Sequence, residues 1–145
     1  MGKIVFASGV FDILHAGHIG FFKKAKKFAG DDGTFIVATH DDKSISAAKG
    51  ENRPVNKAAD RIEVLNSIKY IDAVILWNGW ENIQELVMLI KPDFIVVSGK
   101  EYKNKFVEQF CKENGIGLKV FPRSKRLSTT QIINKIQLAS VKTSK

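Results

Sequence analysis

The chain has 145 residues, of which 44% are hydrophobic, and a formal net charge of +8. This length suits one domain with a sizeable core and is too short for two ordinary domains. The sequence lacks an apolar run near the roughly 18 residues of a membrane span and lacks the layout of a secretory signal. Cys111 is the only cysteine, which excludes an intrachain disulfide and disfavours a thiolate zinc site, so we expect a reducing, cytoplasmic location.

The positive charge is compatible with nucleic-acid binding, with anionic metabolites, or with solvated lysines. Its densest cluster, KKAKK at 23–27, is interleaved with Phe22, Ala25 and Phe28, which recur at helical spacing. Most of these lysines are therefore expected on the solvated face of a helix. We expect neither nucleic acid nor a membrane among the partners.

Hydrophobic periodicity predicts strands and helices that alternate along the chain. The predicted strands are near-continuous apolar runs, as expected when helices cover both faces of a parallel sheet. In chain order we expect a strand over 3–8, a helix over 18–29, a strand over 34–39, a helix over 58–69, a strand over 72–77, a helix over 81–90, a strand over 93–98, a helix over 105–114, a strand over 118–122 and a helix over 129–139.

This order predicts a single-domain α/β fold with a doubly wound, Rossmann-like parallel sheet of about five strands and right-handed crossovers. We place the domain over residues 1–138 and a basic, frayed tail over 139–145. Ser128 and Gln131 form a Ser-x-x-Gln capping box at the start of the last helix.

The longest stretch without a predicted element runs from 40 to 57, and such a loop is usually functional or mobile. In open α/β sheets, ligands bind outside the carboxyl ends of the strands, where the strand order reverses. We therefore expect the segments that follow strands to converge on one site; they are 8–18, 40–57, 98–103 and 122–130.

The segment GVFDILHAGHIGFF, residues 9–22, places His15 and His18 where the first strand gives way to the first helix. The P-loop and GxGxxG fingerprints are absent from the sequence. Gly17 lets a ligand approach backbone amides, and the helix beginning near His18 offers unpaired N–H groups and the positive end of its dipole. Two imidazole N–H groups can then point at one anion, which predicts a phosphate clamp.

Two alternatives for these histidines stay open. The pair could bind a metal if His40, Asp12 and Asp41 completed the ligand set, although a dedicated metal site is not what we expect. The rings could also be hydrogen-bonded structural histidines.

Four segments resemble those of known enzymes. GVFDILHAGHIGFFKKAKKFA resembles the HxGH signature of the small nucleotidyltransferases, the cytidylyltransferase-like superfamily, and RLSTTQIINKI resembles the C-terminal I-S-T-T segment of the same superfamily. RPVNKAADRIEVLNSIKYIDAVI is similar to the middle of bacterial heptose-1-phosphate adenylyltransferase domains, where VSGKEY occupies the place of a similar loop. Glycerol-3-phosphate cytidylyltransferases are similar at FDILHAGH, NGWEN and PRSKRLSTT.

The resemblance implies that a phosphate on a small acceptor attacks the α-phosphorus of a nucleoside triphosphate and that pyrophosphate leaves, with Mg²⁺ bound to the triphosphate. The implied reaction is ATP-dependent adenylylation of a heptose 1-phosphate. The alternatives are CTP-dependent cytidylylation of glycerol 3-phosphate or another polyol phosphate, and synthesis of a flavin adenylate. A non-catalytic nucleotide or nucleic-acid binder is the alternative of another class. The resemblance also implies a homodimer.

The family motifs also imply site residues. Arg61 could instead pair with Asp60 or Glu63, Ser128 could serve in capping alone, and Lys49 could be a solvated lysine. Asp12 could orient the motif or bind magnesium through water. The implied catalytic residues are His15, His18 and Arg123; the implied nucleotide-binding residues are Gly9, Val10, Phe11, Asp12, Gly17, Gly99, Glu101, Tyr102, Ser128, Thr129 and Thr130; the implied acceptor-binding residues are Lys49, Arg61 and Trp80.

Overall fold

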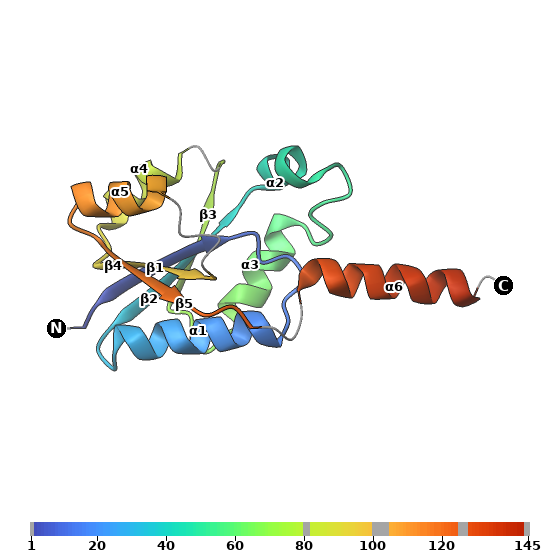
Figure 1. Ribbon diagram of the computed structural model, residues 1–145, viewed down its shortest axis with the longest axis horizontal. Helices are drawn as coiled ribbons and strands as arrows, with labels where there is room; N and C mark the ends of the chain where they lie inside the picture. The colour runs from blue at the N-terminus through green and yellow to red at the C-terminus, as the bar shows by residue number, and fades with distance from the viewer. Residues whose placement is uncertain (1, 80–81, 100–104, 125–127, 144–145) are drawn as a thin grey trace.

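Five strands form one parallel sheet in the computed structural model, which describes residues 2–79, 82–99, 105–124 and 128–143. The strands are β1 (Ile4–Gly9), β2 (Thr34–His40), β3 (Ala73–Trp77), β4 (Phe94–Ser98) and β5 (Gly117–Phe121). They lie in the order β3-β2-β1-β4-β5, and every neighbouring pair is parallel (Figure 1). The predicted doubly wound parallel sheet is confirmed.

Helices cover both faces of this sheet. On one face lie α1 (Ala16–Ala29) and α3 (Ala58–Asn66), and on the other lie α4 (Ile83–Ile90) and α5 (Lys105–Glu113) (Figure 1). Side chains alternate between the faces along β1: Val5 and Ala7 join the core beneath α1, whereas Phe6 packs with α4. Burial on both faces explains why the strands are continuous apolar runs.

The strand order reverses next to β1. From β1 the chain adds β2 and then β3 on one side, and it returns to place β4 and β5 on the other side. The carboxyl ends of β1 and β4 therefore flank the point of reversal, where open α/β sheets bind ligands.

A short helix, α2 (Asp42–Lys49), occupies the first half of the segment that we predicted to be without structure. That prediction is wrong, and ordinary capping signals account for the helix. The Asp41 carboxylate accepts a hydrogen bond from the Ser44 amide at 3.1 Å, Gly50 ends the helix at φ +103°, and Ile45 is fully buried. A single buried side chain gives too little periodicity to recognise.

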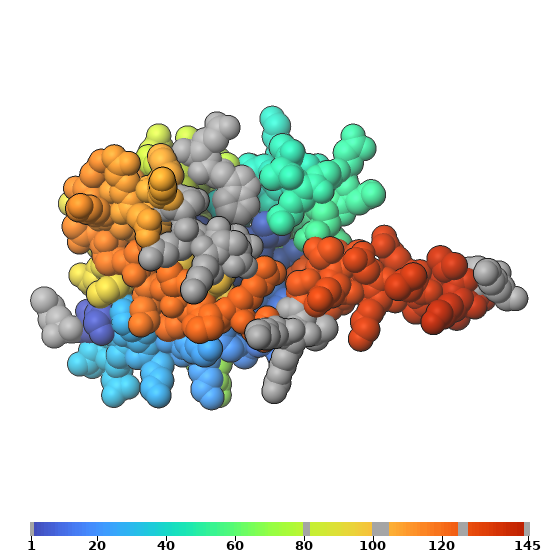
Figure 2. Space-filling model, in the orientation of Figure 1, coloured from blue at the N-terminus to red at the C-terminus, as the bar shows by residue number. Residues whose placement is uncertain are grey.

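The last helix, α6 (Thr129–Thr143), stands out from the rest of the molecule (Figures 1 and 2). It continues four residues beyond its predicted end, so most of the segment that we predicted as a frayed tail is helical. The added residues contain neither Gly nor Pro, and the Ser140 hydroxyl donates to the Ile136 carbonyl within the helix. Neither α6 nor any other described helix is long and apolar enough to cross a membrane.

The other predicted elements agree with the structure to within three residues at each end, and two helix ends show why they differ. The first helix begins at Ala16 instead of 18, because His15 caps it. The helix predicted over 58–69 ends at Asn66, and hydrogen-bonded turns follow it at Ile68 and Ile71. Both differences lie at helix ends, where sequence periodicity is weakest.

Phe22 provides a test of the core on the α1 face. Its fully buried ring has centroid distances of 5.3 Å to Phe11 and 6.2 Å to Phe35. We expect Phe22→Ala to lower the free energy of unfolding by about 3–5 kcal/mol, because the lost ring leaves a cavity. Urea denaturation followed by circular dichroism measures this loss. Phe106→Ala removes the same group from a site that is 65% exposed and should cost less than about 1 kcal/mol; equal losses would contradict the placement of Phe22.

Candidate active site

A cleft of about 660 Å³ lies beyond the carboxyl ends of β1 and β4. The paired residues of these strands are Val5 with Phe94 and Phe6 with Ile95, and the cleft is lined by residues that follow these pairs on both strands. The other walls come from α1, α4, α5, the end of α2 and the region after it, the region after β5 and the start of α6. The site is therefore at the position that the strand order predicts.

Most of the predicted site residues meet in this cleft. Trp80, Glu101 and Tyr102 lie outside the described residues. Gly99 and Arg61 are not among the described residues that line the cleft; Gly99 follows β4 and donates its N–H to the Phe121 carbonyl at 2.8 Å. The predicted residues that line it are Gly9, Val10, Phe11, Asp12, His15, Gly17, His18, Lys49, Arg123, Ser128, Thr129 and Thr130.

The turn between β1 and α1 is built around Phe11. Its backbone has φ +49°, in the left-handed region that is unfavourable for a residue with a side chain. A Cβ atom at Gly9 would lie 2.7 Å from the Phe11 ring, so Gly9 makes room for this ring. The ring packs edge-on against Phe22 and against His18, at a centroid distance of 5.9 Å from His18. Phe11 thereby supports one side of the His18 imidazole.

His15 and His18 cap the amino terminus of α1 with their own rings. The Nδ1 atom of His15 accepts a hydrogen bond from the Gly17 amide at 3.1 Å, and the Nδ1 atom of His18 accepts one from the His15 amide at 3.2 Å. Because Nδ1 is an acceptor in both rings, each neutral ring carries its proton on Nε2. The ring centroids are 4.0 Å apart. The turn thus holds two neighbouring Nε2–H donors in the cleft wall.

This capping corrects our expectation that the first-turn amides of α1 are unpaired. The Gly17 amide donates to the His15 ring, and the His18 amide donates to the His15 carbonyl at 3.0 Å. A Cβ atom at Gly17 would lie 2.8 Å from His15 Cε1, so this glycine is needed for the packing of His15. An anion site at this turn therefore depends on the imidazole donors more than on the backbone.

Burial keeps both rings neutral. It is the main cause that lowers the pKa of His18 to about 4, and the nearby His15 and Arg123 lower it further. Burial, followed by the Arg123 charge, also lowers the pKa of His15. At neutral pH the two rings therefore act as neutral hydrogen-bond donors rather than as cations.

Asp12 joins the segment after α2 to the turn between β1 and α1, which carries His15 and His18 and is called the histidine turn below. Its buried carboxylate accepts hydrogen bonds from the amides of Val55 at 2.6 Å and Asn56 at 2.8 Å, and Arg53 Nε lies 3.5 Å from the same carboxylate. Each carboxylate oxygen accepts a backbone hydrogen bond, which fits the predicted orienting role. Arg53 itself lines the cleft and was missed by the sequence analysis, although it begins the RPVN segment that carries the resemblance.

The prediction that Arg61 binds the acceptor is wrong. Its side chain is completely buried and makes five hydrogen bonds, one for each N–H group of a guanidinium. No donor is left for an acceptor phosphate, so we assign Arg61 a structural role. Its acceptors are the carbonyls of Asn56, Val10 and His40, the Thr39 hydroxyl and the Asp42 carboxylate.

The start of α6 forms the wall that carries the STT segment. The predicted capping box is present: the Ser128 amide donates to Gln131 Oε1 at 3.0 Å, and the Gln131 amide donates to the Ser128 hydroxyl at 3.2 Å. The Thr129 hydroxyl donates to the Ile13 carbonyl at 3.0 Å, which joins α6 to the histidine turn. Ser128, Thr129 and Thr130 all line the cleft, so capping and contact with a ligand are compatible.

The charges of the cleft suit a polyanion. Among the residues that the structure describes, its lining contains Lys49, Arg53 and Arg123, against one carboxylate, Asp12, which is already hydrogen-bonded. Within the described ranges, no group of three or more His, Cys, Asp or Glu side chains could hold a metal ion, and His40 does not line the cleft with the other two histidines. The geometry therefore favours the phosphate site over the metal site.

The Arg61 network can be tested by a conservative substitution. Arg61→Lys keeps the charge but has three donors in place of five, which leaves buried acceptors unpaired. We expect it to lower the free energy of unfolding by about 2–4 kcal/mol in urea denaturation. Lys27→Arg, the reverse exchange at an exposed position of α1, is the control and should have little effect. Unchanged stability of Arg61→Lys would contradict the structural role.

The lowered histidine pKa makes stability depend on pH. As the pH falls below 6.5, His18 of the unfolded chain binds a proton, while folded His18 does so only near pH 4. The free energy of unfolding should therefore be highest above pH 6.5 and fall between about pH 6.5 and pH 4. His18→Gln, which can still cap the helix, should reduce this slope without abolishing it, because burial also lowers the pKa of His40 to about 4. Urea titrations at a series of pH values measure the slope, and an unchanged slope in the variant would refute this assignment.

Comparison with known proteins identifies similar sequences. The model of the cytidylyltransferase-like family matches residues 6–142. The bifunctional protein HldE of Campylobacter fetus is 38% identical over 136 residues, which cover 92% of this chain and 28% of that protein. HldE of Wolinella succinogenes is 39% identical over 137 residues, with coverages of 93% and 27%. The chain thus spans little more than a quarter of the length of these relatives.

Solved structures share the fold. The lipopolysaccharide core biosynthesis protein from Thermoplasma volcanium superposes with a TM-score of 0.66 and 29% identity, over 88% of this chain and all of that one. The pantoate-beta-alanine ligase from Francisella tularensis superposes with a TM-score of 0.63 and 19% identity, over 93% of this chain and 70% of that one. At 19% identity the second likeness concerns the fold alone.

Proposed function

The chain belongs to the cytidylyltransferase-like family, and from this membership we propose that it transfers a nucleotidyl group from a nucleoside triphosphate to the phosphate of a sugar or polyol phosphate. The cytidylyltransferase-like family predicted from the HxGH and STT segments is confirmed by the family match, and the similarity to HldE proteins agrees with it.

As substrates we propose ATP and a heptose 1-phosphate. The resemblance to heptose-1-phosphate adenylyltransferase domains continues through the RPVN segment, whose residues Arg53, Val55 and Asn56 surround Asp12. The name of the Thermoplasma volcanium structure, a lipopolysaccharide core biosynthesis protein, supports a sugar phosphate as the acceptor. CTP with glycerol 3-phosphate is the second candidate, favoured by the NGWEN segment at 78–82.

The pair of Nε2–H donors is the observation that carries this proposal. An oxygen of the acceptor phosphate attacks the α-phosphorus and forms a new P–O bond, while the bond to the β-phosphate oxygen breaks and pyrophosphate leaves with its electron pair. The neutral rings of His15 and His18 donate to the oxygens on which negative charge accumulates during this exchange. Donors that are fixed before the reaction need no reorganisation when the charge develops.

This reaction does not require a catalytic base. A phosphate monoester has a second pKa of about 6 and is mostly ionised at neutral pH, so the acceptor is already a nucleophile. Positioning the two substrates and neutralising their charges are then the main tasks of the protein. Two histidines that are held neutral and used as donors fit these tasks.

The remaining cleft residues divide between the two substrates. We propose that Arg123 and the amino terminus of α6 at Ser128–Thr130 hold the β- and γ-phosphates, and that Lys49 lies with the acceptor. Mg²⁺ enters with the triphosphate as part of the substrate and neutralises its charge. A cytoplasmic location and assembly as a homodimer are part of the same proposal.

Pyrophosphate release tests the reaction. The protein is incubated with Mg²⁺, with ATP or CTP, and with heptose 1-phosphate, glycerol 3-phosphate or other sugar and polyol phosphates. We expect release with ATP and heptose 1-phosphate and formation of a nucleoside diphosphate sugar. Release only with CTP and a polyol phosphate would select the second candidate. Binding of nucleic acid with no release for any pair would overturn the enzymatic proposal.

His18 provides the mutational test of the mechanism. We expect His18→Ala to lower kcat by about 10²–10³, because one preorganised donor is lost. Loss of the helix cap and of the ring contact with Phe11 should lower the free energy of unfolding by about 1–3 kcal/mol, so the variant should remain folded. Steady-state pyrophosphate release and a thermal melt measure the two effects, with Lys23→Ala on the exposed face of α1 as the control. An unfolded His18→Ala, or one with unchanged kcat, would count against a catalytic role.

A further inference from the structure

The last helix, α6, stands out from the molecule and carries exposed apolar side chains (Figures 1 and 2). The structure describes all of Thr129–Thr143, and none of these side chains is buried. Ile136, Leu138 and Val141 are 59%, 64% and 59% exposed. An isolated helix of this length is only marginally stable in water, and most helices in proteins are stabilised by the packing of their apolar side chains. Another surface is therefore needed to cover α6.

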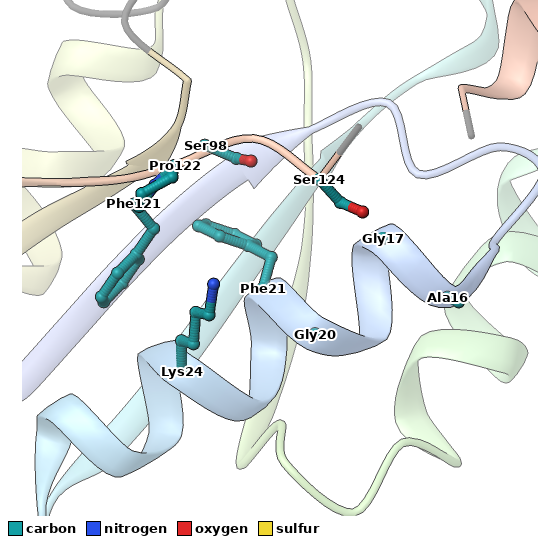
Figure 3. A pocket seen from close by; sticks show the side chains of 9 residues that line it. All are labelled: Ala16, Gly17, Gly20, Phe21, Lys24, Ser98, Phe121, Pro122 and Ser124. Atoms are coloured by element: carbon teal, nitrogen blue, oxygen red, sulfur yellow. The ribbon is translucent and has the colours of Figure 1, made fainter. Parts of the chain in front are cut away.

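The root of α6 is attached to the cleft. The segment after β5 passes over the first turns of α1, where Ser124 lies next to Gly17 (Figure 3). A Cβ atom at Gly17 would lie 3.5 Å from Ser124 Cβ. At the start of α6 the Thr129 hydroxyl donates to the Ile13 carbonyl at 3.0 Å. The helix therefore leaves the molecule at a fixed point, and its outer part is the part that needs a covering surface.

The side chains of α6 define the chemistry of the surface that covers it. Ile132 and Ile136, four positions apart, lie on one side of the helix. Leu138 lies on another side, three positions after Lys135 and four positions before Lys142. These two lysines are the only charged residues between 129 and 143. One side of α6 therefore needs an apolar partner, and the other needs acidic groups beside an apolar one.

The exposed face of α3 has this second kind of chemistry. Its exposed charged residues, Asp60 and Glu63, are both acidic, because Arg61 is buried. Val64 lies on the same side of the helix and is 47% exposed. Among the described residues, no ion pair uses these two carboxylates or the lysines of α6. The face of α3 is thus complementary in charge to α6.

A second copy of this chain can bring α6 to α3. Both helices start beside the histidine turn: the Asn56 amide, just before α3, donates to Asp12 at 2.8 Å, and the root of α6 is bound to the adjacent Ile13. From there α6 points away from the α3 of its own chain (Figure 1). A two-fold axis beside α6 places the α6 of each copy on the α3 of the other, so that every contact forms twice. Each copy has a formal net charge of +8, so two copies need such contacts between unlike charges to stay together.

We propose that two copies of this chain pair through α6, which lies between the α6 and the α3 of the partner. The two α6 helices run antiparallel and touch along the side that carries Ile132 and Ile136. The side that carries Lys135, Leu138 and Lys142 lies against the acidic face of the partner's α3. Because each copy offers the same surface to the other, the contact closes on itself and gives a dimer instead of a filament. The homodimer of the proposed function leaves this surface unassigned.

The pairing also has a consequence for the cleft, which rests on the proposed function. Ser128–Thr130 begin α6 and line the cleft, where we place the β- and γ-phosphates. A partner that holds the outer part of α6 also steadies this wall. Dilution of the protein below the dissociation constant of the dimer should therefore raise KM for ATP several-fold, as measured by pyrophosphate release.

A charge placed inside the interface tests the pairing. We expect the unsubstituted protein to sediment at micromolar concentration with twice the 16.2 kDa mass of one chain. Leu138→Asp should raise the dissociation constant of the dimer by about tenfold or more, because the carboxylate replaces an apolar contact at the centre of the interface. Leu89→Asp introduces the same group on α4, at a site that is 75% exposed and lies outside the interface, and should leave the mass unchanged. Circular dichroism checks that both variants are folded.

An exchange of charges tests the contact with α3. Lys135→Glu alone and Glu63→Lys alone should each raise the dissociation constant several-fold, because like charges then face each other. The double variant, which carries both substitutions, should recover most of the loss, since the pair is restored with its signs reversed. Lys23→Glu, on the exposed face of α1, is the control for the change in net charge. A double variant that dissociates as readily as the single variants would overturn the pairing of α6 with α3.

The remaining outcomes separate this surface from the proposed function. A monomer at every concentration, or a dimer that survives Leu138→Asp, would overturn the pairing through α6. Both are measured by mass without any substrate, so they do not depend on the reaction. If the dimer forms and dissociates as described while no substrate pair releases pyrophosphate, the proposed function fails and the interface stands.

Discussion

A single buried guanidinium fixes the relative positions of the segments that carry the site. Arg61 joins the end of β1, through the carbonyl of Val10, to the end of β2, through Thr39 and His40. It also reaches the first residue of α2 at Asp42. A buried cation is costly unless its hydrogen bonds are complete, so these segments must assemble together or not at all. The carboxyl edge of the sheet is therefore rigid where the cleft begins.

Hydrogen bonds from this edge of the sheet also hold the histidine turn in place. Asn56 accepts a hydrogen bond from Arg61 through its carbonyl and donates to Asp12 through its amide, so the two buried charged groups share one connecting residue. On the far side, Thr129 holds the turn through the carbonyl of Ile13. The turn is thus supported from both sides, and its imidazole donors are oriented before a substrate arrives. Such preorganisation is the main source of electrostatic catalysis.

Much of this arrangement could be predicted from the sequence, because strong local signals specify it. Apolar runs separated by helical periodicity predict the parallel sheet, and the HxGH and STT segments predict which loops converge. Features that depend on contacts between distant segments could not be predicted. The burial of Arg61 is an example, since its partner Val10 lies 51 positions away. The sequence alone also gives no sign that the His15 ring accepts the Gly17 N–H, because this bond depends on the rotamer that the ring adopts in the folded chain.

The cleft offers a polyanion two kinds of electrostatic interaction, one with full positive charges and one with the N–H dipoles of two neutral imidazoles. Lys49, Arg53 and Arg123 carry full charges, whose attraction for a distant polyanion is weakened by dissolved ions over a Debye length of about 8 Å at physiological ionic strength. In the proposed reaction, the Nε2–H groups of His15 and His18 act as short-range dipoles on the phosphate that they contact, and dissolved ions weaken such a contact much less. Added salt would therefore weaken the binding of a nucleotide more than it would slow the transfer step. The transfer step can therefore keep its rate when the ionic strength around the protein changes.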